Sequence, residues 1–261
     1  MPGWMDVRTG AGHGRGVDDR GGPARLRAQH GAVGDGISDW PRAVCALADH
    51  LGLGRFAVLA HSLGSAFALA GGPTLGDRLA VIVIASGRGP LQPGERFHPG
   101  SRADNLYWRL ARRQAFWLPD PLCRLSGTMV LRSVRGDPQR FTHGMARRLP
   151  EADRLTTQRL LARPGAQAAL IEDLRESYRQ GTTVMAADLL RYTRPWDFRL
   201  DQVTATVHLW HGEQDPKVPI TAARQLASSL PHCHTHFGPG GHLMACDHAG
   251  EILTTVTSAF E

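Results

Sequence analysis

The chain has 261 residues, of which 42% are hydrophobic and 21% charged, which is enough for one large core or a core with an inserted subdomain. No apolar run is long enough to cross a bilayer, and the first residues lack the apolar middle of a secretory signal, so we expect a cytoplasmic protein with no membrane partner. The formal charge of +6 comes from scattered arginines without interleaved aromatic residues, which argues against a nucleic-acid partner.

The cysteines point to the same compartment. Four are present, and no two form a CxxC pair (Cys45, Cys123, Cys233, Cys246). In a cytoplasmic chain of this size, we expect them to be buried as small hydrophobic residues rather than joined in a disulfide framework.

Residues 1–36 are dense in glycine and arginine and show no apolar period, which predicts an irregular segment or disorder. From Ile37 the pattern changes, because apolar residues recur three or four apart as far as Leu51, which predicts an amphipathic helix. Ser38 or Asp39 is expected to cap the start of this helix, and Gly52 or Gly54 to end it.

Four short apolar segments then predict buried strands, at residues 56–60, 79–85, 206–210 and 233–237. Helical stretches are predicted between and after them, at residues 64–71, 220–230 and 247–260. Strands that alternate with helices predict an α/β fold with a mostly parallel sheet covered by helices on both faces. We assign residues 37–95 and 197–261 to this core.

Residues 96–196 differ, because only helical patterns are found there. One predicted helical face carries four large apolar residues (Leu118, Leu122, Leu125, Met129), and a similar pattern ends near Gly181. This block interrupts the strand series, so we expect an inserted all-helical lid over one end of the sheet.

The sequence "AHSLG" stands between the first predicted strand and the helix after it. A serine on so tight a turn needs small neighbours two residues away, and Ala60 and Gly64 supply them. The turn exposes the Ser62 hydroxyl above the sheet edge. It also directs the Leu63 backbone N–H toward negative charge that develops there.

This strand, turn and helix resemble the nucleophile elbow of the α/β-hydrolase fold superfamily, whose motif is G-x-S-x-G; alanine here takes the first small position. The resemblance implies an acid and then a histidine further along the chain. Asp215 in "VHLWHGEQDPKVP" looks like the family's acid, and His242 in "HFGPGGHLMACDH" looks like its histidine. Ser62 would then attack an acyl carbonyl, His242 would transfer the proton and Asp215 would orient the imidazole, with Leu63 as one oxyanion donor.

The expected substrate is a small or medium apolar ester cleaved through an acyl-enzyme, with neither cofactor nor metal. Apolar lining is usual in such pockets, and the candidate lining residues are His61, Trp108, Phe116, Trp117, Tyr178 and Tyr192. A cofactor-free haloperoxidase-like enzyme or a carbon–carbon bond hydrolase would share the same three residues.

Each assignment has an alternative. Asp215 precedes a proline and could form only a turn, and Glu213 and Asp247 are rival acids, although Asp247 is expected to cap the last helix. The run "HCHTH" (His232, His234, His236) places three histidines on one strand face, a spacing that could bind a metal, but no fourth ligand is evident.

The resemblance is poor before Ile37, where the superfamily places three strands and a loop with the second oxyanion donor. We therefore expect the chain to begin late in the fold, and the segment Ser86–Pro90 is the candidate second donor. A truncated or degenerate protein that only binds or scaffolds is the competing hypothesis. Missing strands would also leave a sheet edge open for pairing between copies, so a homo-oligomer is possible on this interpretation.

Overall fold

A computed structural model of the chain describes residues 36–91, 119–177, 188 and 191–261. The predictions for residues 1–35 and for Trp108, Phe116, Trp117 and Tyr178 lie outside the described residues. Within the described ranges, no helix combines the length and apolar character needed to span a membrane. Cys45, Cys233 and Cys246 are free thiols.

The core contains a parallel sheet of four strands in the described part of the chain: β1 (Phe56–His61), β2 (Leu79–Ala85), β3 (Val207–Gly212) and β4 (Cys233–Gly238). They lie in the order β1-β2-β3-β4, and each neighbouring pair is parallel. The four predicted strands are confirmed, with ends that move by at most two residues. Among the described strands β1 pairs only with β2, so it lies at an edge, where Leu59 is 39% exposed.

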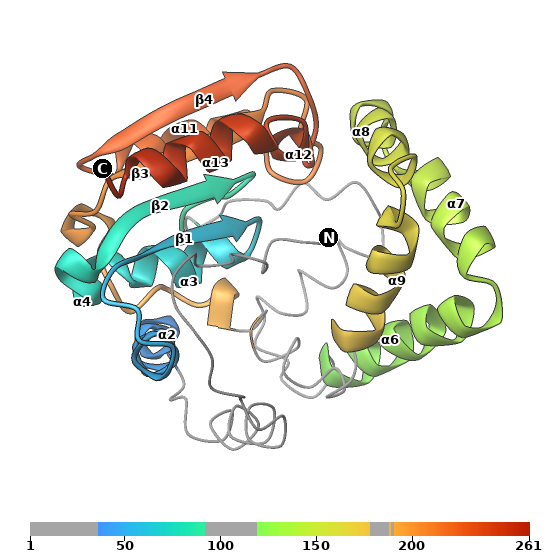
Figure 1. Cartoon of the computed structure of the whole chain (residues 1–261), viewed down its shortest axis with the longest axis horizontal. Helices are drawn as coiled ribbons and strands as arrows, with labels where there is room; N and C mark the ends of the chain where they lie inside the picture. The colour runs from blue at the N-terminus through green and yellow to red at the C-terminus, as the bar shows by residue number, and fades with distance from the viewer. Residues whose placement is uncertain (1–35, 92–118, 178–187, 189–190) are drawn as a thin grey trace, which may run out of the picture.

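Helices cover both faces of this sheet, as predicted (Figure 1). Alternate residues of a strand point to opposite faces, and β2 follows this rule. Ile82 and Ile84 pack in a cluster with α3 (Gly64–Ala70) and α11 (Ile220–Ser228). Val83 and Ala85 pack instead with α12 (Met244–Asp247) and α13 (Ala249–Ser258). Since both faces are buried, β2 needs apolar residues at consecutive positions.

The helix predicted from Ile37 begins as a 3₁₀ turn, η1 (Ile37–Asp39), and continues as α2 (Trp40–His50). Asp39 is the N-cap residue of α2, but neither predicted side chain caps it: the Ser38 hydroxyl donates to Asp197, and the Asp39 carboxylate accepts from the Gly36 N–H before η1. The predicted end is confirmed, since Gly52, with a φ of +69°, follows the last turn. Three short elements complete the core: α4 (Gly72–Leu75), η2 (Gly76–Arg78) and η3 (Leu200–Gln202).

Between β2 and β3, residues 119–177 form the helices α6 (Pro119–Gly136), α7 (Pro138–Arg148), α8 (Glu151–Leu161) and α9 (Ala166–Ser177). They pack against one another, and α8 contacts α12 of the core. Figure 1 shows these helices beyond the carboxyl ends of the strands. Two residues of the predicted apolar face, Leu125 and Met129 of α6, are 55% and 57% exposed.

Candidate active site

Ser62 occupies the sharp turn between β1 and α3. Its φ is +56°, a left-handed conformation that costs an L-residue roughly 1–2 kcal/mol. Its N–H donates to the Ala85 carbonyl at 2.8 Å, which ties the turn to the end of β2. A Cβ placed on Gly64 would lie 3.7 Å from the Ala60 Cβ, in van der Waals contact, so β1 and α3 approach each other closely at these two positions. The geometry matches the strained turn that the sequence predicted.

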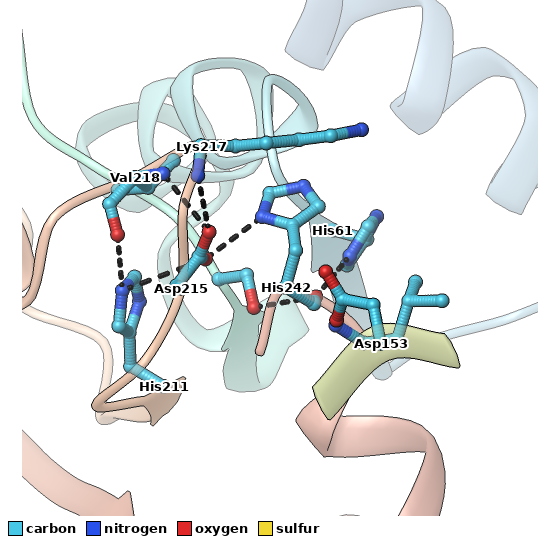
Figure 2. Close-up of polar contacts among 9 residues, drawn as sticks. His61, Asp153, His211, Asp215, Lys217, Val218 and His242 are labelled. Carbon is cyan, nitrogen blue, oxygen red and sulfur yellow. Dashed lines mark hydrogen bonds and ion pairs between the residues drawn. The ribbon is translucent and has the colours of Figure 1, made fainter. Parts of the chain in front are cut away.

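Asp215 and His242 meet at the same end of the sheet, in the loops that follow β3 and β4. His242 Nδ1 lies 2.8 Å from Asp215 Oδ2, and both side chains are almost completely buried (Figure 2). A carboxylate oxygen only accepts, so the Nδ1 atom of His242 carries the proton of this hydrogen bond.

The other carboxylate oxygen of Asp215 accepts two hydrogen bonds from the backbone of its own loop. Asp215 Oδ1 accepts from the backbone N–H groups of Lys217 at 2.8 Å and Val218 at 3.0 Å. Burial by itself raises the pKa of Asp215, but the hydrogen bonds from His242 and from these two amides outweigh it, so the pKa lies below its usual value. Asp215 is therefore both the turn former of the alternative reading and an ionised partner for His242.

His211, at the end of β3, binds the backbone of the loop that carries Asp215. Its Nε2 donates to the Val218 carbonyl at 2.9 Å and lies 3.6 Å from Asp215 Oδ2. Desolvation lowers the pKa of His211, so the fully buried ring is neutral at neutral pH. Its Nδ1 has no hydrogen-bond partner among the described residues.

Two core residues hold the carbonyl group of His242. The Ser86 hydroxyl donates to it at 2.8 Å, and His61 Nε2 donates to it at 3.1 Å. The His61 and His242 rings lie 4.8 Å apart, edge to face. Desolvation of the ring, followed by the charge of His242, lowers the pKa of His61 to about 4, although the residue as a whole is exposed. His61 therefore contacts the histidine loop, a role that we did not expect for a pocket-lining candidate.

Ser62 and His242 share no hydrogen bond in the described part of the chain. The hydrogen bonds of His242 in the described residues go to Asp215, His61 and Ser86, and Ser62 is not among these partners. In enzymes without substrate, the catalytic hydrogen bond is often long and forms fully only in the complex. His61, the residue before Ser62, contacts both the ring and the backbone carbonyl of His242.

The structure also shows where the other residues named in the sequence analysis lie. Glu213 is exposed, and the carboxylate that binds His242 Nδ1 is that of Asp215. The prediction that Asp247 caps the last helix is wrong: its carboxylate binds Thr156 and Arg159 of α8. Tyr192 is buried in a cluster with Ile37, Ala66 and Ala70, which favours packing over pocket lining. Both donors of Ser86 are engaged, by Trp210 and by His242, so Ser86 itself is not a second oxyanion donor.

The alternating histidines stack instead of converging on a metal. His208 Nδ1 and His236 Nε2 form a hydrogen bond at 3.0 Å, His236 stacks on Trp210, and His232 is exposed. Among residues 36–91, 119–177, 188 and 191–261, no group of three or more histidine, cysteine or acidic side chains is arranged to hold a metal ion.

One residue of the site was missed by sequence reasoning. Asp153 of α8 is buried, and its Oδ1 accepts from the Leu243 backbone N–H at 2.8 Å, directly after His242. Nothing in the local sequence "EADRL" distinguishes this aspartate from an ordinary acidic residue in the first turn of a helix.

Comparison with known proteins agrees with this architecture. The chain matches the alpha/beta hydrolase fold family over residues 37–249. A thermophilic esterase from Thermogutta terrifontis is similar at 19% identity, with 85% of this chain and 71% of that chain covered and a TM-score of 0.51. The esterase RhEst1 from Rhodococcus sp. ECU1013 is 15% identical, with 87% of this chain and 74% of that chain covered and a TM-score of 0.52. A bromoperoxidase from Bacillus anthracis is 18% identical, with 87% of this chain and 75% of that chain covered and a TM-score of 0.50. At such identities the structures show a shared fold, and the sequence match shows that this chain belongs to the α/β hydrolase fold family.

Proposed function

We propose that this protein is a serine hydrolase that cleaves a carboxylic ester through an acyl-enzyme. Ser62 is the nucleophile, His242 the general base and Asp215 the acid that orients it. The observation that carries the proposal is the buried hydrogen bond of 2.8 Å between His242 Nδ1 and Asp215 Oδ2. The strained turn of Ser62 supports it, since it directly follows His61, which contacts His242.

The protonation of this pair favours the assignment. Because Asp215 is ionised and accepts from Nδ1, the proton of a neutral His242 is held on Nδ1 and its Nε2 keeps a lone pair. That lone pair can take the proton of the Ser62 hydroxyl as its oxygen attacks the ester carbonyl. The proton then passes to the leaving alcohol, and water repeats the sequence to release the acid and free Ser62.

Stabilisation of the tetrahedral intermediate is assigned to the Leu63 backbone N–H. Leu63 follows the nucleophile and is the residue immediately before α3, so its N–H is one of the donors that a helix start leaves without an intrahelical partner. One such donor typically contributes about 10²–10³-fold in rate. The second donor is not assigned to a residue.

The position of helices α6–α9 supports the proposed substrate class. Helices α6–α9 stand at the carboxyl ends of the strands, where the three residues lie. A helical cover over this end favours an apolar acyl group, because pockets that bury most of a ligand are lined mainly by apolar side chains. A small or medium apolar ester is the proposed substrate.

A fluorophosphonate probe tests the nucleophile directly, since it reacts covalently with an activated serine. We expect labelling of the wild-type protein and none of the Ser62→Ala variant, and hydrolysis of p-nitrophenyl esters with a preferred chain length. Folded wild-type protein that is neither labelled nor active on any ester would contradict the proposal and favour a binding or scaffold role.

A further inference from the structure

We propose that Asp153, on the lid helix α8, is a positioning residue for His242. It acts through the backbone amide of Leu243, so the lid takes part in holding the catalytic histidine as well as covering the site. This inference rests on the proposed function, in which His242 is the general base.

The contact is close and shielded from solvent. Asp153 is 2% exposed, and its Oδ1 accepts the Leu243 N–H at 2.8 Å (Figure 2). A Cβ placed on Gly241 would lie 2.3 Å from Asp153 Oδ1 and 2.6 Å from its Cγ, so this backbone is pressed against the carboxylate. Hydrogen bonds to an ionised acceptor are shorter and stronger than neutral ones, and a buried carboxylate needs such a donor.

The position of this hydrogen bond in the peptide explains its effect on His242. The His242 carbonyl and the Leu243 N–H belong to one planar peptide group. Ser86 and His61 bind the carbonyl side, from the ends of β2 and β1. Asp153 binds the amide side, from the lid. Without it, the plane is held on one side only and can rotate about the bond that joins it to the His242 Cα atom.

A second contact docks the same helix independently. Thr156 donates to Asp247 Oδ2 at 2.6 Å, and Arg159 bonds both oxygens of Asp247, at 3.2 and 2.6 Å. Asp153, Thr156 and Arg159 are three residues apart and therefore share one face of α8. Because this second contact remains when Asp153 is replaced, α8 is expected to stay docked in an Asp153 variant.

The design of the test follows from the two contacts. Asp153→Ala removes the acceptor, and Asp153→Asn keeps an oxygen that can still accept from Leu243. Arg159→Gln is the matched control, since it weakens the docking of α8 without touching the histidine loop. Each variant is compared with wild type by thermal melting, ester kinetics, fluorophosphonate labelling and hydrogen exchange at the Leu243 amide.

We expect Asp153→Ala to lower kcat and the labelling rate by about 10-fold or more, up to the roughly 10²-fold that an ångström of misplacement costs, with KM nearly unchanged. The Leu243 amide should exchange faster, and Asp153→Asn should recover most of the rate. Arg159→Gln should keep kcat and Leu243 protection near wild type.

Three results would overturn the inference: wild-type kcat and Leu243 protection in Asp153→Ala, a change in KM alone, or an equal loss in Arg159→Gln. Failure of the proposed function is distinguishable, because it appears as an unlabelled wild-type protein. In that case the Leu243 exchange rate and the proton resonance of His242 Nδ1 still decide whether Asp153 positions this histidine: unchanged values in Asp153→Ala refute it.

Discussion

Replacement of Asp215 by asparagine tests the proposed mechanism most sharply, because it alters one atom of the acid and leaves the shape of the loop. Asp215 Oδ1 accepts two backbone N–H groups, and Oδ2 faces His242 Nδ1. In Asp215→Asn the amide oxygen keeps the two backbone donors and the NH₂ group faces His242. Nδ1 must then accept, so the ring proton moves to Nε2, and the imidazole can no longer take the Ser62 proton.

The alternative orientation of the new amide is unfavourable. A flipped amide would accept from His242 but would leave the N–H groups of Lys217 and Val218 without an acceptor. A buried, unsatisfied donor costs about 1–3 kcal/mol, a penalty that applies in full to the buried Val218 N–H and only partly to the part-buried Lys217 N–H, so the flip costs at least about 1–3 kcal/mol. The wrong tautomer therefore dominates, and we expect kcat to fall about 10⁴-fold, as for the same change in another serine triad. This corresponds to about 5.5 kcal/mol of transition-state stabilisation.

The assay compares fluorophosphonate labelling and ester kinetics of wild type, Asp215→Asn and Glu213→Gln, with a thermal melt of each. Glu213 is the matched control, since it is an exposed acid two residues earlier on the same loop. We expect Glu213→Gln to react as wild type does and Asp215→Asn to keep its KM. A folded Asp215→Asn protein within tenfold of the wild-type rate would refute the assignment of the acid.

Three further predictions concern stability. Ser62→Gly and Ser62→Ala should both be unlabelled, but the glycine variant should resist denaturant better by about 1 kcal/mol, because glycine tolerates positive φ; equal midpoints would contradict the strain. Gly212→Ala should lower the free energy of unfolding by about 1–3 kcal/mol, since its Cβ would lie 2.3 Å from two backbone carbonyl oxygens of the histidine loop. As a control, Gly250→Ala on α13, where a Cβ meets open space, should raise the free energy of unfolding by about 0.5–1 kcal/mol. Urea titrations measure both variants, and an equal loss of stability in the two would contradict the clash at Gly212. The folded-state pKa of His61, about 4, and that of His211 lie below 6.5, so the unfolded chain binds these protons more readily. The contribution of these two histidines to the free energy of unfolding should be fully present above about pH 6.5 and be lost as the pH drops toward 4. A melting temperature that stays constant over this pH range would contradict the expectation.

The local parts of the site were readable from the sequence because short segments determine them. The apolar run at 79–85 has the bounds of β2, since a strand buried on both faces must be apolar at consecutive positions. The small residues around Ser62 predicted the strained turn, because only such neighbours allow a strand and a helix to approach so closely. The family assignment followed from these signals and the order of the two later loops.

Contacts between distant segments had no such signal. The partner of Asp153 is Leu243, ninety residues later, and His61 binds the backbone carbonyl of His242, a contact that the sequence did not predict. Leu125 and Met129 of α6 fit the apolar period but are exposed, because periodicity does not say which face meets the core. The sequence thus determined the strands, the serine turn and the fold family, because backbone sterics and apolar patterning act within a few residues. Only the tertiary structure decided which side chains hold His242, because those hydrogen bonds depend on how the lid and the strand ends pack together.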